Sequence, residues 1–207
     1  WLLVADRIWD KIVLLNSIEN VDLIGEKFSD IARMRGIDPY DLVFDLLLEE
    51  GAAMHQLLWT SNSFSQSDLE LCLEQEECAV ISDTLALAPY GPLEKKVGSL
   101  SGYGWTPEFL SKYVNEKKII SIEEGIRRIT SLPAKRLGVK DRGILKENMK
   151  ADIVVFDTGS IRSTWTVKEP RSYPKGIEHV FVNGRQTISA GERTTVNNGT
   201  VLRAPFA

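Results

Sequence analysis

The stretch Cys78-Ala79-Val80-Ile81-Ser82-Asp83-Thr84 decides how the rest of the chain is interpreted. Its apolar run contains β-branched residues, which is typical of a buried strand, and Asp83 stands at the carboxyl end of that run. In a barrel of alternating strands and helices, active sites lie at the carboxyl ends of the strands. A carboxylate there can serve as a metal ligand or a general base, although aspartate is also a common cap and turn residue. Asp83 is therefore the candidate catalytic and metal-binding residue.

The composition limits the classes of protein to which the chain can belong. The 207 residues carry 25 basic and 29 acidic side chains, a net charge of −4, and 43% of them are hydrophobic. This composition can supply a core, and it contains no basic run of the kind that binds nucleic acid or an anionic membrane. No stretch approaches about 20 uninterrupted apolar residues, and no secretory signal pattern opens the chain. We therefore expect a cytoplasmic globular protein without nucleic-acid or membrane partners.

The cysteines and histidines favour structural roles. Cys72 and Cys78 cannot form a disulfide framework, and Cys72 belongs to an apolar helical face, so we expect both to be buried thiols of a reducing compartment. His55 lies in a predicted strand with apolar neighbours, and His179 lies in a β-rich region. A single histidine in such company is more often a core or rim residue than a metal ligand.

Strand and helix signals alternate from residue 1 to about Gly138. The predicted strands are Ile12 to Leu15, Ala53 to Trp59, and Cys78 to Asp83. The predicted helices are Ser29 to Gly36, Asp38 to Gly51 with Pro39 in its first turn, one opened by a capping box at Ser67 to Glu70, one from Thr106, one opened by a capping box at Ser121 to Glu124, and a turn from Pro133 to Gly138. Residues 86–104, rich in glycine and proline, predict a long loop.

Beyond Gly138 the helical periodicity gives way to short β-rich runs. These are Ala151 to Phe156, His179 to Val182, Gln186 to Ser189 and Thr200 to Leu202, with Asn183-Gly184 as a hairpin turn. The sequence therefore predicts an α/β part over residues 1–138 and a small all-β domain over residues 139–207.

Three predicted strands joined by helical crossovers would leave an apolar edge on each side of a parallel sheet. A complete eight-stranded barrel needs roughly 250 residues, so we expect only the later part of one here. A missing N-terminal half or a partner chain would then cover the open edges. The first residue is Trp1 rather than Met, which indicates that the chain opens inside something larger, was processed, or was truncated.

An ordered set of motifs resembles the N-acyl-D-amino-acid deacylases, or D-aminoacylases, of the amidohydrolase superfamily. The motifs are Glu26-Lys27, Ala32 through Pro39, Leu46 to Glu50, Ile81-Ser82-Asp83, Ile122 through Ala134, Ala151 to Asp157, and Tyr173 to Gly184. The resemblance covers nearly the whole chain. It implies the C-terminal portion of a metal-dependent (β/α)8 barrel followed by a small β-sandwich domain, and hydrolysis of the amide bond in a small-molecule N-acyl-D-amino acid.

The resemblance also implies a role for Asp83, which matches the aspartate of a Ser-Asp-Gly segment at the end of the eighth barrel strand. There the carboxylate contacts a site for one or two zinc ions, takes a proton from the metal-bound water, and passes it to the leaving amine. The remaining ligands, including a His-x-His pair, are implied to lie upstream of Trp1.

Two departures from the family pattern leave the substrate-binding residues unassigned. Thr84 stands where the family has glycine, and the loop before Tyr103-Gly104 lacks the family's histidine and arginine. Two alternatives stay open, the first suggested by the altered loop and the second by the absent His-x-His pair and the missing half of the barrel. One is a cyclic-amide hydrolase of the same superfamily, and the other is an inactive truncated or structural piece.

Overall fold

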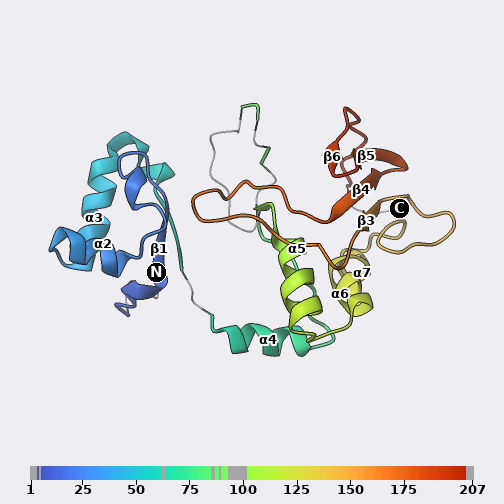
Figure 1. The fold of residues 1–207 in the computed structure, drawn as a ribbon, viewed down its shortest axis with the longest axis horizontal. Coiled ribbons are helices and arrows are strands. Elements are labelled where there is room, and N and C mark those ends of the chain that lie inside the picture. Colours follow the sequence, from blue (N-terminus) through green and yellow to red (C-terminus); the bar gives the residue numbers. More distant parts are fainter. Residues whose placement is uncertain are drawn as a thin grey trace. The chain divides into compact units, whose positions relative to one another are not determined.

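The computed structural model describes residues 4, 6–61, 64–84, 87–88, 90–92 and 102–203. Spatial contacts group the chain into two compact units. Unit 1 comprises residues 1–69, 87–99 and 166–170, and unit 2 comprises residues 70–86, 100–165 and 171–207, so α4 (Gln66–Glu74) spans the division. The predicted boundary between residues 138 and 139 stays a prediction. Figure 1 shows the order of the elements along the chain.

A two-stranded antiparallel sheet organises unit 1. Strand β1 (Ile12–Asn16) pairs with β2 (Leu58–Ser61), with Ile12 opposite Ser61. On its other side β1 contacts the chain near Gly25, whose N–H donates to the Leu14 carbonyl at 2.8 Å. Unit 1 also contains the short helices η1 (Trp9–Lys11), η2 (Val21–Leu23) and η3 (Gly51–Gln56), together with α2, α3 and the first residues of α4.

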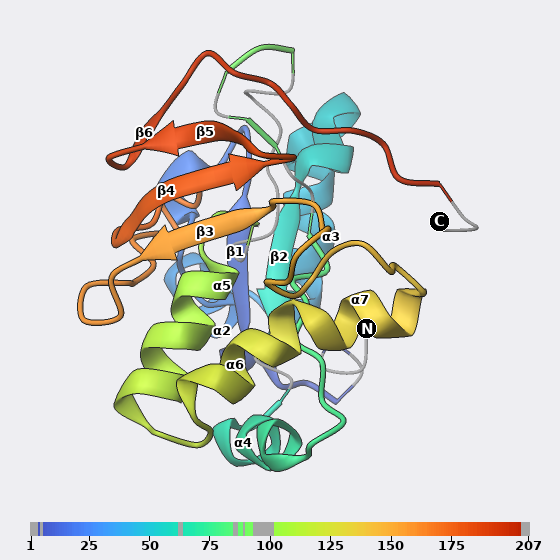
Figure 2. The same ribbon diagram turned by 90° about the vertical axis from the view of Figure 1, so that its right-hand side faces the viewer.

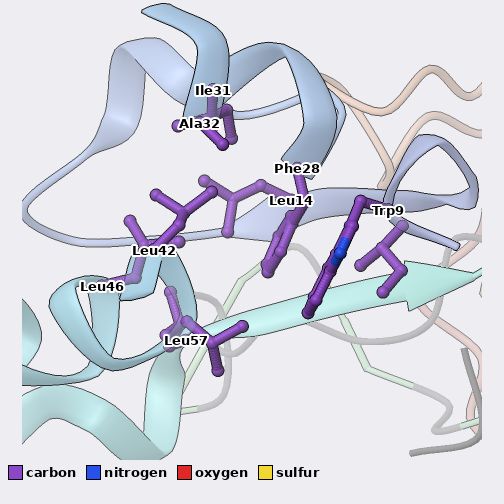
Figure 3. Close-up of a cluster of buried hydrophobic side chains, with 10 residues drawn as sticks. Trp9, Leu14, Phe28, Ile31, Ala32, Leu42, Leu46 and Leu57 are labelled. Carbon is purple, nitrogen blue, oxygen red and sulfur yellow. The ribbon is translucent and has the colours of Figure 1, made fainter. Parts of the chain in front are cut away.

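Helices α2 (Phe28–Arg35) and α3 (Pro39–Glu50) cover this sheet and are delimited by local signals. Gly36 ends α2 in the left-handed conformation, and Asp38 caps α3 by accepting a hydrogen bond from the Tyr40 N–H at 2.8 Å. Figure 3 shows side chains of the two helices meeting those of β1 and the chain before β2. The labelled core residues are Trp9, Leu14, Phe28, Ile31, Ala32, Leu42, Leu46 and Leu57.

Unit 2 contains a helical layer. Helix α5 (Trp105–Glu108) continues into the π-helical stretch η5 (Phe109–Glu116), which packs against α6 (Ile122–Ile129). Helix α7 (Ser131–Leu137) follows and ends at Gly138 in the left-handed conformation. As predicted, Ser121 caps α6 by accepting a hydrogen bond from the Glu124 N–H. The buried core of this layer consists of Leu73, Phe109, Leu110, Val114 and Ile161.

A four-stranded antiparallel sheet completes unit 2, with strand order β3-β4-β5-β6 (Figure 2). The strands are β3 (Ile153–Phe156), β4 (Ile177–Val182), β5 (Arg185–Ser189) and β6 (Glu192–Arg193). Asn183 and Gly184 both have positive φ values, 48° and 79°, so the predicted hairpin turn is present. Asn148 likewise has a φ of 65°, in the left-handed region that asparagine tolerates better than most residues.

Several predictions about individual elements are wrong. The first two strands pair antiparallel, and Ala53 to Gln56 lie in η3, so His55 is exposed on a short helix rather than enclosed in a strand. The capping box of α4 uses Ser65, whose hydroxyl accepts a hydrogen bond from the Asp68 N–H at 3.1 Å, and Ser67 lies inside the helix. Thr200 to Leu202 form no strand, whereas the unpredicted β6 does.

The chain is thus a mixed α/β structure. Among the residues that the structure describes, no helix has the length and hydrophobicity required to cross a membrane. Most of the predicted loop at 86–104 falls outside the described residues.

Gly176 and Gly138 provide a matched test of packing in unit 2. Both have positive φ, 86° and 76°, but a Cβ at Gly176 would lie 2.5 Å from the Ile161 Cα, whereas one at Gly138 would meet nothing within 4 Å. Both alanine substitutions incur the left-handed strain of roughly 1–2 kcal/mol. We expect Gly176→Ala to lower the free energy of unfolding by about 2 kcal/mol more than Gly138→Ala, measured by denaturant titration. Equal losses would contradict the close approach.

Candidate functional site

The path to Asp83 begins at the end of α4. The Gln75 N–H donates to the Cys72 carbonyl at 3.2 Å, and the Cys78 N–H donates to the Gln75 carbonyl at 3.0 Å, so the chain turns directly after the helix. The segment Cys78–Thr84 then leaves this turn. Its Val80 N–H donates to the Arg128 carbonyl at 3.1 Å, which fixes the segment to α6.

Three arginines bind carbonyls at the end of α4 and in the turn that follows. Arg128 donates to the Leu73 carbonyl, Arg127 to the Glu76 carbonyl at 2.7 Å, and Arg136 to the Glu77 carbonyl. These arginines belong to α6 and α7. Guanidinium groups carry several donors in a fixed fork, so one side chain can hold backbone and carboxylate acceptors together. The base of the Cys78–Thr84 segment is consequently tied to both helices.

Arg128 is almost fully enclosed, with 1% of its surface exposed. A buried guanidinium requires a compensating charge, and Glu124 supplies it through an oxygen 2.7 Å from Arg128 Nε. Glu124 also accepts two hydrogen bonds from Arg127, at 2.6 and 2.8 Å. These charge-assisted bonds, first from Arg127 and then from Arg128, lower the pKa of Glu124 to about 2.

Cys78–Thr84 is not a strand in the described chain, which corrects the prediction. A strand is defined by its ladder of hydrogen bonds, and among the described residues none runs alongside this segment. Cys78 and Val80 pack against the core of unit 2, whereas Ile81 is 72% exposed. The segment is therefore half covered at its base and open further along.

Asp83 is exposed and has a φ of 46°, in the left-handed region that aspartate occupies more readily than most residues. Its carboxylate can therefore be reached by water and small molecules. The next residue, Thr84, is half-buried, and its hydroxyl oxygen is enclosed without a hydrogen-bond partner. The structure describes Asp83 and Thr84 but not the two residues that follow.

The described residues do not fit a complete metal centre. Among them, no group of three or more histidine, cysteine, aspartate or glutamate side chains is placed to hold a metal ion. The Nδ1 atom of His179 accepts a hydrogen bond from the Ala190 N–H at 3.2 Å, in keeping with a structural role. Cys72 is exposed, contrary to prediction, although its neighbour Leu73 on α4 is buried, and Cys78 is half-buried. Asp83 could contribute one carboxylate ligand to a centre completed elsewhere.

Sequence reasoning missed the arginines that position this segment. The capping box at Ser121 correctly predicted α6, but it gave no sign that Arg128 points inward, because charged residues are usually placed on the solvent side. A partial signal exists in the spacing of Glu124 and Arg128, four residues apart on one helix face.

Comparison with known proteins identifies the family. A model of the amidohydrolase family matches residues 29–188, which is more than half of the chain and includes the Asp83 segment. The chain belongs to the amidohydrolase family.

This amidohydrolase chain is similar to curated relatives of two kinds. It is 29% identical over 181 residues to an N-acyl-D-aspartate deacylase of Alcaligenes xylosoxydans xylosoxydans, covering 87% of this chain and 33% of the relative. It is also 29% identical over 124 residues to a dihydroorotase of Lactobacillus acidophilus, covering 56% of this chain and 28% of the relative. The chain thus spans about a third of the length of these relatives.

Solved structures share the fold of the amidohydrolase chain. A crystal structure of D-aminoacylase matches with a TM-score of 0.74 at 23% identity, covering 91% of this chain and 37% of that one. An N-acyl-D-glutamate deacylase from Bordetella bronchiseptica, complexed with zinc and a phosphonate inhibitor, matches with a TM-score of 0.68 at 24% identity, covering 93% and 38%. At this identity the likeness establishes the amidohydrolase fold.

The Glu124 carboxylate predicts how stability depends on pH. Its folded pKa of about 2 lies below the ordinary value of 4.5, so its ion pairs stabilise the folded state fully above pH 4.5 and lose that effect as the pH falls towards 2. We expect Glu124→Gln to be less stable than the wild type at pH 7, and the difference to shrink between pH 4.5 and 2. Denaturant titrations of both proteins at several pH values measure this difference in the free energy of unfolding.

Glu147→Gln is the matched control for this experiment. Glu147 is exposed and forms no ion pair with another described residue, so its substitution removes a charge without breaking the network. A stability difference for Glu124→Gln that stays constant from pH 7 to pH 2 would contradict the assigned pairing.

Proposed function

We propose that this chain is the C-terminal portion of a metal-dependent amidohydrolase that cleaves the amide bond of N-acyl-D-amino acids or related compounds. The observation that carries the proposal is the family match across the segment that presents Asp83 as an exposed carboxylate. The deacylase relatives favour an N-acylated amino acid as the substrate class. In the complete protein, residues 1–138 would contribute to a (β/α)8 barrel, and residues 139–207 to a small β-sandwich domain.

The proposed role of Asp83 is to move one proton twice. Its carboxylate accepts a proton from the attacking water, whose oxygen then bonds to the acyl carbon. When the carbon–nitrogen bond breaks, the same carboxyl group gives the proton to the departing amine nitrogen, and a carboxylic acid and an amine are released. General acid–base catalysis of this kind contributes roughly 10²- to 10⁴-fold to a rate. The exposure of Asp83 provides the access that both transfers need.

A zinc centre of one or two ions, when bound, would lower the pKa of the attacking water. Because the described residues form no group able to hold a metal, the proposal places the other ligands in the part of the protein before Trp1. The same missing part would cover exposed Ile81 and pair with the open Cys78–Thr84 segment. A separate partner chain in that position could supply the same ligands and cover the same surface.

A cyclic-amide hydrolase is the second candidate because dihydroorotases are among the relatives. Ring opening of a cyclic amide breaks the same kind of carbon–nitrogen bond and needs the same proton transfers. The two substrate classes differ in whether the amine and the acid separate after cleavage. Substrate profiling therefore distinguishes them.

The first test removes the proposed base. We expect Asp83→Asn and Asp83→Ala in the full-length protein to lower kcat by at least about 100-fold, because neither side chain accepts a proton at neutral pH. Asp22→Asn, which neutralises an exposed aspartate in unit 1, should leave kcat unchanged. Circular dichroism shows whether each variant is folded, and metal analysis shows whether it contains the same amount of metal as the wild type. Turnover within twofold of the wild type in Asp83→Ala would exclude the proposed role.

The second test compares substrates. We expect the full-length protein to hydrolyse N-acetyl-D-aspartate, N-acetyl-D-glutamate or N-acetyl-D-leucine with a kcat/KM at least tenfold above that for dihydroorotate or hydantoin. Amine release and ring opening are followed by chromatography. A reversed preference would favour the cyclic-amide hydrolase.

The third alternative is that the 207 residues alone are inactive, with a structural or binding role. Metal analysis of the purified chain tests this alternative. We expect less than stoichiometric zinc and no turnover, since the described residues provide no metal cluster. Stoichiometric zinc together with turnover would refute the hypothesis that the 207 residues alone are inactive.

A further inference from the structure

A cavity of about 790 Å³ lies in unit 2, between α7 and the chain that follows it. This volume falls in the range of small-molecule sites, roughly 300–1,000 Å³. Its walls come from the end of α7, from the turns between Gly138 and Met149, and from Glu77 and Arg127. No residue of the Asp83 segment lines it, although Arg127, Ser131, Leu132 and Ala134 belong to the motif Ile122 through Ala134.

The lining of this cavity is cationic, although the chain as a whole has a net charge of −4. Its charged residues are Arg127, Lys135, Arg136, Lys140 and Arg142, with Glu77 as the one carboxylate of the described lining. The arginines are partly neutralised, because each bonds a carboxylate: Glu124, Glu77 and Asp152, respectively. Lys135 and Lys140 are exposed and form no ion pair with a described residue.

A structural explanation covers only part of this charge. Lys135 and Arg136 lie in the last turn of α7, where cations complement the helix dipole without any ligand. Lys140 lies beyond Gly138, outside the helix, and has no such role. Arg142 forms ion pairs with Asp152 and, at 3.7 Å from its Nε atom, with Asp141, so its charge is compensated. The positive charge of this wall that the fold does not account for is therefore that of the lysines, above all Lys140.

The remaining lining is largely apolar. Leu132 is 7% exposed, Val139 and Met149 are half-buried, and Ile144 is 48% exposed. Gly143 brings this chain against α7, since a Cβ there would lie 2.9 Å from the Ala134 Cβ. This close approach of Gly143 to Ala134 holds the two sides of the cavity wall together. Exposed apolar surface beside uncompensated cations suits a ligand with both an anionic group and a hydrocarbon body.

We propose that this cavity binds a small carboxylate that carries a medium-length hydrocarbon chain. Lys135 and Lys140 bind the carboxylate, and Leu132, Val139 and Met149 contact the hydrocarbon. A lysine pair can follow a carboxylate head that is not fixed in one orientation, because each ammonium offers three donors on a flexible stem. The proposal does not depend on the proposed hydrolytic activity.

Octanoate is the probe, titrated into the full-length protein by isothermal calorimetry. We expect one saturable site whose affinity falls as salt is added, since the attraction is partly between exposed charges. Acetate, which lacks the chain, and octanol, which lacks the charge, should each bind at least tenfold more weakly. Equal binding of octanol would overturn the role of the lysines, and equal binding of acetate would overturn that of the apolar wall.

The double variant Lys135→Gln/Lys140→Gln locates the site. Both side chains are exposed, so the substitutions should lower the thermal unfolding temperature by no more than about a few degrees, through the loss of Lys135 from the last turn of α7, while weakening octanoate binding at least tenfold. Lys146→Gln/Lys150→Gln, which removes two exposed lysines outside the described lining, is the matched control and should bind as the wild type does. An absence of saturable octanoate binding to the wild type, or equal affinity in the first double variant, would overturn the proposal.

Discussion

The enclosure of one guanidinium group, that of Arg128, sets the arrangement of unit 2. Its side chain donates to Glu124 and to the Leu73 carbonyl, and its own carbonyl accepts from the Val80 N–H. An uncompensated charge in this position would cost several kcal/mol, so the partners have to assemble together. Helix α6, the end of α4 and the start of the Cys78–Thr84 segment are therefore placed by a single residue.

Unit 1 applies the same principle with the opposite charge. The Glu50 carboxylate is 4% exposed and accepts hydrogen bonds from the Ser17 hydroxyl and from the N–H groups of Ile18 and Glu19. It thereby joins the end of α3 to the turn that follows β1. In unit 1 the buried carboxylate is satisfied by groups of residues 17–19, which have no regular structure of their own. In unit 2 the buried guanidinium of Arg128 is satisfied by the Glu124 carboxylate and by the Leu73 carbonyl at the end of α4. In both units, a buried charge near the end of one helix thereby holds a segment that is distant in the sequence.

Most of the features that the sequence predicted correctly have causes that lie within about four residues, although the local capping box predicted at Ser67 is an exception. Asp38 with Pro39, Ser121, Gly36 and Asn183-Gly184 all act locally, and the structure confirms each of them. Features that depend on distant residues were missed or wrong. The orientation of β1 is set by β2, some 45 residues away, and Arg128 reaches a carbonyl 55 residues earlier. No periodicity in the sequence records such pairings.

The prediction for the Asp83 segment failed for a more specific reason. Its composition is that of a strand enclosed on both faces, and composition describes the environment that a segment suits rather than the partners available to it. Here α6 anchors Val80, and Ile81 is left 72% exposed next to an open carboxylate.

The segment thus combines a fixed base with an apolar surface that its own chain leaves uncovered. An apolar β-branched side chain at such a position is stabilising only when something packs on it. The same neighbour that covered Ile81 would restrict the backbone on either side of it, and would thereby limit the positions open to the Asp83 carboxylate. Proton transfer requires the Asp83 carboxylate to lie within hydrogen-bonding distance of the group with which it exchanges the proton. The orientation of the proposed catalytic group is therefore coupled to the burial of the residue two positions before it.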